Sequence, residues 1–287
     1  MRRIRYSRIL FIWIFLYIFL AVSSTESEAR VLSKSRGKRR SKPHSVSAKS
    51  AFFINSSRQK RLYSKNAYMK VQPASTTKVM TVLLVMERLD LNKVLIVSAN
   101  ASNVQPSKLH LVPGEQYKVK DLLYAVLLNS ANDASIVLAE AVAGSEAEFV
   151  KLMNDRARRL GARETKFSNS NGLPTRGVSQ YTTAYDMYLI FREALKYDFF
   201  REAITYKFKT IYSQRGRRIP LRSHNKMLFT DWGKNIYGKT GYTRAAQSCF
   251  VGCFLKQKDI FIITVFGCNK RWEDIKYILK TIGRFPL

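Results

Sequence analysis

Strand patterns lie at the two ends of this chain and helical patterns lie between them, an order that few folds accommodate. Short apolar runs at 51–54 and 61–63 flank the polar turn 55–57, which predicts a β-hairpin. Two longer apolar runs, 247–255 and 260–267, predict a second hairpin near the end. Because strands bury their apolar faces by sharing a sheet, the order predicts one sheet closed by both ends of the chain around a helical insert.

Apolar residues at helical spacing fill the region between the two hairpins. The expected helices cover 76–89, 119–128, 132–143, 146–160 and 185–195, and a final helix covers 270–281. In the first of these helices the apolar residues form one broad face. The sequence therefore predicts an α/β fold.

The first 29 residues have the composition of an export signal. Residues 1–8 contain four arginines, and residues 9–22 are uncharged and almost wholly apolar. The apolar run is shorter than the ~20 residues that span a bilayer comfortably. Both a cleaved signal peptide and a short uncleaved anchor in the cytoplasmic membrane remain open, and each places the protein in the periplasm or cell envelope.

Residues 30–46 are rich in serine, lysine and arginine, which predicts a flexible basic tether ahead of a catalytic domain at 47–287. The whole chain has 50 basic and 20 acidic residues, a formal charge of +30. Such an excess favours an anionic partner, which by charge alone could be nucleic acid, membrane headgroups or an acidic polymer. The export segment argues against nucleic acid.

Cysteine and histidine are too sparse for a disulfide framework or a metal centre. The chain has only three of each: Cys249, Cys253, Cys268, His44, His110 and His224. Cys249 and Cys253 lie on one predicted strand, too far apart to bridge each other. A bond from either to Cys268 remains open, but free thiols are the expected state, and we expect no metal and no cofactor.

One serine and one lysine have a setting that suits nucleophilic catalysis. The pattern S-x-x-K occurs four times, but only Ser75 and Lys78 directly precede a long amphipathic helix. At that spacing the amine lies within hydrogen-bonding reach of the hydroxyl. Lysine can take the serine proton only when its amine is neutral, and burial or a second cation favours that state. Lys239 could supply the second cation. Taken alone, without the other motifs, Ser75 is better explained as a helix N-cap and Lys78 as an ordinary surface cation.

Two further motifs follow in a fixed order along the chain. Ser130-Ala131-Asn132 lies in the break between two predicted helices, and Lys239-Thr240-Gly241 is the single K-T-G. With Ser75-Thr76-Thr77-Lys78, they resemble the three active-site motifs of the penicillin-recognising serine enzymes. The sequence is most similar to the D-alanyl-D-alanine carboxypeptidases among the low-molecular-weight penicillin-binding proteins. The resemblance covers about residues 47–285, and its other matching segments are 171–174 and 182–187.

The resemblance implies both a fold and roles for individual residues. The fold would be a five-stranded antiparallel sheet flanked by helices, with an all-helical subdomain and the active-site cleft between them. Ser75 would be the acylated nucleophile and Lys78 its general base, while Ser130 would relay a proton toward the leaving amine. Substrate binding would fall to Asn132, Lys239, Thr240 and Gly241, and the backbone N–H groups of Ser75 and Tyr242 would form the oxyanion hole.

Three positions depart from the family pattern. Asn171 stands where many relatives have histidine, and Ala246-Gln247 replaces an Ala-Gly pair after the K-T-G motif. His224 stands where some relatives place an arginine near the substrate carboxylate, although a structural role for His224 is the stronger expectation.

The resemblance implies an enzyme that removes the terminal D-alanine from peptidoglycan stem peptides ending in D-Ala-D-Ala, through an acyl-enzyme on Ser75. β-Lactams would act as inhibitors. Two enzymatic alternatives remain open, a D,D-endopeptidase and a serine β-lactamase, although no E-x-x-L-N segment of the lactamase kind occurs. A catalytically inactive basic module that binds the cell wall is the alternative from another class.

Overall fold

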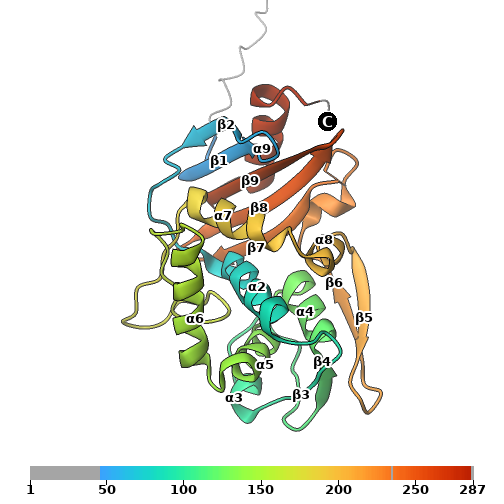
Figure 1. Cartoon of the computed structure of the whole chain (residues 1–287). Helices are drawn as coiled ribbons and strands as arrows, with labels where there is room; N and C mark the ends of the chain where they lie inside the picture. Colours follow the sequence, from blue (N-terminus) through green and yellow to red (C-terminus); the bar gives the residue numbers. More distant parts are fainter. Residues whose placement is uncertain (1–45, 234, 286–287) are drawn as a thin grey trace, which may run out of the picture. The chain divides into compact units, whose positions relative to one another are not determined.

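The computed structural model describes residues 46–233 and 235–285 (Figure 1). The predicted export segment 1–29 and all but the last residue of the predicted tether 30–46 lie outside the described residues, so these boundaries stay predictions. Within the described ranges, none of the helices combines the length and apolar character needed to cross a bilayer.

A five-stranded antiparallel sheet joins the two ends of the described chain. Its strands are β1 (Ser50–Asn55), β2 (Lys60–Lys65), β7 (Tyr237–Thr243), β8 (Gln247–Lys256) and β9 (Asp259–Cys268). Their order across the sheet is β2-β1-β9-β8-β7, so the early hairpin pairs with the last strand. The predicted closure of one sheet by both ends is confirmed, and β7 forms the edge opposite β2.

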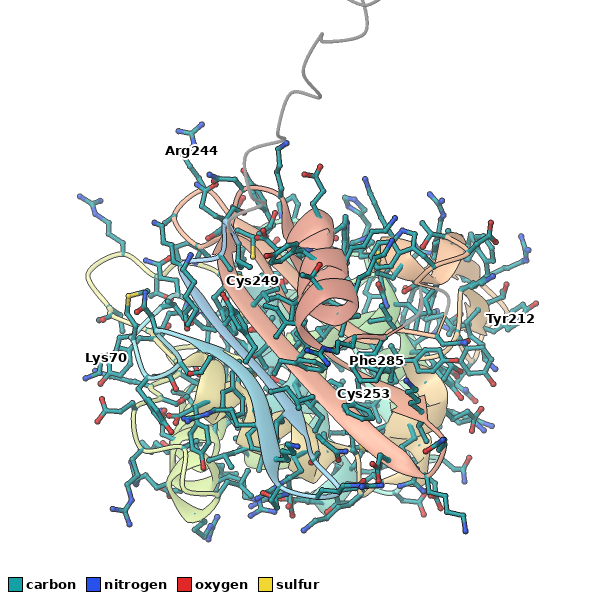
Figure 2. The ribbon with its side chains drawn as sticks, turned by 90° about the horizontal axis from the view of Figure 1, so that it is seen from above. Lys70, Tyr212, Arg244, Cys249, Cys253 and Phe285 are labelled. Carbon is teal, nitrogen blue, oxygen red and sulfur yellow. The ribbon has the colours of Figure 1, made fainter. Side chains whose placement is uncertain are left out.

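Helices cover both faces of this sheet (Figures 1 and 2). One face packs against α7 (Ala184–Ala194), and the other packs against α9 (Arg271–Tyr277) and the short π-helix η3 (Ile278–Ile282). Successive residues of a strand point to opposite faces. Phe52 accordingly joins the large core shared with the helices, whereas Phe53 packs with the residues of α9 and η3.

A helical subdomain lies beyond α7 and is built around α2, which is buried over its first eight residues. Its helices are α2 (Lys78–Arg88), α3 (Ala99–Ser102), α4 (Val119–Leu128), α5 (Asn132–Ala143) and α6 (Glu146–Arg159). Two small two-stranded sheets and a further helix complete the insert: β3 (Val94–Ile96) with β4 (Gln116–Lys118), α8 (Asp198–Ala203), and β5 (Phe208–Tyr212) with β6 (Arg218–Arg222). The predicted α/β fold is thus confirmed.

Two local details differ from the sequence-based expectation. The helix expected from residue 76 begins instead with a 3₁₀ turn, η1 (Ala74–Thr77), and only then continues as α2. A second short 3₁₀ helix, η2 (Lys226–Phe229), follows the polar stretch at 223–225, where no helix was expected. Asn225 caps η2 by accepting a hydrogen bond from the Met227 amide at 3.1 Å.

Candidate active site

Ser75 lies in the 3₁₀ turn that leads into α2, and its hydroxyl faces the first residue of that helix. The Nζ atom of Lys78 lies 3.2 Å from Ser75 Oγ. Neither η1 nor α2 has a side-chain cap, because the N-cap positions belong to Pro73 and Thr77 and neither makes a capping hydrogen bond. The structure therefore contradicts the N-cap alternative for Ser75.

Lys78 is completely buried, and its partners suit a neutral amine. Its Nζ donates to Asn132 Oδ1 and to the Asn171 carbonyl oxygen, both at 2.7 Å. Burial, and then the positive charge of Lys239, lower the pKa of Lys78 well below its ordinary value of 10.5. A neutral amine has two N–H groups for these two acceptors, which leaves its lone pair for the hydroxyl of Ser75.

The contact from residue 171 was missed because it comes from the backbone. The Asn171 side chain instead accepts a hydrogen bond from the Leu173 amide at 2.9 Å, which holds the loop in place. Since the carbonyl group is common to every residue, asparagine at this position leaves the contact to Lys78 intact. The one feature of the sequence that could have pointed to this loop is the neighbouring Gly172, because the positive φ of the loop at that position favours glycine.

Gly172 should tolerate no side chain. Its φ is +84°, and a Cβ there would lie 1.9 Å from the Ala74 carbonyl oxygen in the turn that carries Ser75. We expect Gly172→Ala to lower the free energy of unfolding by roughly 1–3 kcal/mol and to displace the loop from Lys78. Gly177→Ala is the matched control, because Gly177 has φ +72° but open space around it. Thermal unfolding measures both variants, and equal losses would contradict steric crowding at Gly172.

Ser130 and Lys239 form a second polar pair on the other side of the site. Ser130 lies between α4 and α5 with a positive φ of 59°. Lys239 Nζ donates to Ser130 Oγ and to the Thr240 carbonyl oxygen, both at 3.0 Å. Burial, and then the charge of Arg271, lower the pKa of Lys239 to about 7. Asn132, at the start of α5, donates its amide to the Gln105 carbonyl at 2.8 Å and so faces Lys78 with its oxygen.

The edge strand β7 runs directly past the turn that carries Ser75. A Cβ on Gly241 would lie 3.1 Å from the backbone nitrogen of Ser75, so glycine permits this close approach. Tyr242 follows and is 65% exposed. A cavity of about 760 Å³ lies here, and the predicted site residues among its lining are Ser75, Ser130, Asn132, Thr240, Gly241 and Tyr242. Lys78 and Lys239 are buried behind this lining.

Arg271 was not among the predicted site residues, yet it lines the same cavity. Its Nη1 atom donates to the carbonyl oxygens of Gly241, at 3.1 Å, and Cys249, at 2.7 Å. No short motif marks it, because α9 brings it to β7 from the far end of the sequence. His224 also lines the cavity; desolvation by the cavity wall, followed by the charge of Lys239 and other cations, lowers its pKa to about 4.

The three cysteines are free and buried, as expected from the sequence. Burial raises the pKa of Cys249 to about 11 and that of Cys253 to about 12. The side chains of Cys249 and Cys253 join the large core shared with the helices, whereas Cys268 packs with the residues of α9 and η3. A thiol with a raised pKa is a poor nucleophile near neutral pH.

The fold and the two serine–lysine pairs together place the protein in the class of the penicillin-binding proteins. A crystal structure of a penicillin-binding protein homologue from Mycobacterium tuberculosis matches with a TM-score of 0.76 and 27% identity, covering 83% of this chain and 92% of that one. The chain belongs to the D-alanyl-D-alanine carboxypeptidase family, whose sequence profile matches residues 37–270.

Two relatives show the range of names within the family. D-alanyl-D-alanine carboxypeptidase DacF of Bacillus subtilis is 38% identical over 82% of this chain and 61% of its own length. A D-alanyl-D-alanine endopeptidase of Pseudomonas aeruginosa is 30% identical over 70% of this chain and 65% of its own length. The chain thus spans less than two thirds of the length of these relatives.

Proposed function

We propose that this protein is a serine-type D-alanyl-D-alanine carboxypeptidase that trims peptidoglycan stem peptides. The main support is that one cavity holds two serine–lysine pairs. Ser75 faces the buried Lys78, and Ser130 faces the buried Lys239. Family membership supports the same conclusion.

The proposed reaction has two steps. The oxygen of Ser75 attacks the carbonyl carbon of the terminal peptide bond while Lys78 takes the hydroxyl proton. The amide N–H groups of Ser75 and Tyr242 would stabilise the oxyanion, and Ser130 would pass a proton to the nitrogen of departing D-alanine. Water then attacks the ester carbonyl, restores the Ser75 hydroxyl and releases the shortened peptide as its acid.

Lys239, Thr240 and Arg271 are the proposed partners of the substrate's terminal carboxylate. They combine two cationic groups and a hydroxyl beside the edge strand, and an anion is held best by such charge-assisted hydrogen bonds. An enzyme that acts only at a chain terminus requires recognition of that terminal charge. β-Lactams carry a carboxylate near a reactive amide, so we propose that they acylate Ser75 as well.

The direct test is release of free D-alanine from a synthetic peptide that ends in D-Ala-D-Ala. Purified protein should release one D-alanine per peptide, and folded protein that releases none would refute the proposal. The Pseudomonas relative favours endopeptidase action as the second candidate. Digestion of cross-linked muropeptides, followed by mass spectrometry, distinguishes the two activities.

The activity should depend on pH through the two buried lysines. Lys78 must be neutral to accept a proton, so kcat/KM should fall as pH drops through its lowered pKa. Lys239 must be charged to attract a carboxylate, so kcat/KM should also fall as pH rises through a pKa of about 7. We expect Lys239→Arg to move the alkaline limb upward. A profile that rises steadily beyond pH 9 in the unmodified enzyme would contradict these roles.

The proposed location is the cell envelope, outside the cytoplasmic membrane. The arginines of 1–8 and the apolar run 9–22 support export, and the basic residues of the tether support contact with anionic lipid or wall polymer. Fractionation of cells, with determination of the mature N-terminus, tests this proposal and separates a cleaved signal from an anchor.

A further inference from the structure

The active-site cavity is larger than the proposed reaction needs. Its volume is about 760 Å³, whereas cavities that enclose a whole drug-sized ligand measure roughly 300–1,000 Å³. Two alanine residues fill only part of such a space. The remaining lining therefore has room to contact a further part of the substrate.

That lining carries more positive charge than one carboxylate requires. Arg271 lies beside Thr240 and Gly241, and Arg222 and Lys226 line another part of the wall, at the end of β6 and the start of η2. No aspartate or glutamate of the described residues lines the cavity. Within the same part of the chain, none of these three cations has a carboxylate within 4.0 Å, although eleven other ion pairs occur.

Arg222 is held in position although it is exposed. Its guanidinium carbon lies 4.8 Å from the centre of the Phe229 ring, and that ring packs edge-on against Phe208 at 5.5 Å. The backbone amide of Arg222 donates to Asn129 Oδ1 at 2.8 Å, which ties the end of β6 to the end of α4. A guanidinium stacked on a ring keeps its N–H edge available for a carboxylate.

The short helix η2 fixes the aromatic support and the second cation. The Asn225 side chain caps η2 and also donates to the Ile236 carbonyl oxygen at 2.7 Å. Lys226 and Phe229 are the first and last residues of η2, so this anchoring positions both. The polar segment 223–225 thus has a structural role in the cavity wall.

We propose that Arg222, assisted by Lys226, forms a second anion subsite that selects peptides with another carboxylate besides the terminal one. The preferred substrates would then be stem peptides in which a side-chain carboxylate is free rather than amidated. This inference rests on the proposed function, because it concerns the substrate of the same cavity. A carboxylate gains two parallel N–H···O bonds from arginine, whereas the corresponding amide offers only one acceptor oxygen.

The test compares two synthetic pentapeptides that end in D-Ala-D-Ala and differ only in one upstream side chain, glutamate or glutamine. The purified full chain should have a kcat/KM for the acid roughly tenfold above that for the amide, the effect of one charged hydrogen bond. Arg222→Gln should reduce this preference to near unity while activity on the amide peptide persists. Arg222→Lys should retain part of the preference, which a merely structural role would not predict.

Arg218→Gln is the matched control, because Arg218 is exposed on the same strand but does not line the cavity. This variant should keep the full preference for the acid. Equal release of D-alanine from both peptides by the unmodified enzyme would overturn the subsite and leave the proposed function standing. Release from neither peptide would overturn both, and a preference that survives Arg222→Gln would overturn the assignment to Arg222.

Discussion

Replacing Ser75 by alanine should abolish both D-alanine release and covalent labelling by a fluorescent penicillin. The expected loss of kcat is on the order of 10⁶-fold, since removal of the nucleophile from a serine peptidase leaves only binding and oxyanion stabilisation. The Ser75 hydroxyl caps neither helix, and its one polar side-chain contact in the described chain is with Lys78 Nζ at 3.2 Å. The melting temperature should therefore change little, and labelling, activity and thermal unfolding are measured on the same preparation.

Ser107→Ala supplies the control for this experiment. Ser107 lines the same cavity, but its hydroxyl donates to the Asn129 carbonyl at 3.1 Å and lies in no serine–lysine motif. This variant should be labelled by penicillin at a rate close to that of the unmodified protein. Persistent labelling of Ser75→Ala would mean that another residue is acylated, and mass spectrometry of the labelled peptide would identify it.

The fold could be predicted from the sequence wherever local pattern and long-range order agree. Both hairpins of the sheet follow from apolar runs separated by polar turns, and β9 had to pair with β1 to bury both. The 3₁₀ turn at Ser75 could not be predicted in this way. The η1 residues Ala-Ser-Thr-Thr carry no apolar pattern that would reveal the turn, and the close approach of Gly172 and β7 to it comes from distant parts of the chain.

The residues of the candidate site were also predictable only in part. Side chains in short motifs were predictable, because Ser75 with Lys78 and Lys239 with Thr240 each sit within one turn or one strand segment. Contacts made by backbone atoms, or brought by distant elements, left no local pattern. The Asn171 carbonyl reaches Lys78 from a loop, and Arg271 reaches Gly241 from the last helix. Only the packing of the whole chain creates these contacts.

Lys78 should be nearly as important for acylation as Ser75. We expect Lys78→Met to slow acylation by penicillin by roughly 10²–10⁴-fold, the usual contribution of a general base. Methionine fills a similar volume but leaves Asn132 Oδ1 and the Asn171 carbonyl without their donor at 2.7 Å. The melting temperature should therefore fall as well, which makes a second variant necessary.

Lys78→Arg separates the loss of the base from the loss of those hydrogen bonds. Arginine can still donate to both acceptors, but its guanidinium does not release a proton at any working pH. If Lys78 is the base, this variant should show a cooperative thermal unfolding transition, and its Ser75 should still be acylated slowly by penicillin. Its residual rate should also lack the acid limb that the lowered pKa of Lys78 gives the unmodified enzyme. An acid limb that persists in both variants would show that a different group accepts the proton from Ser75.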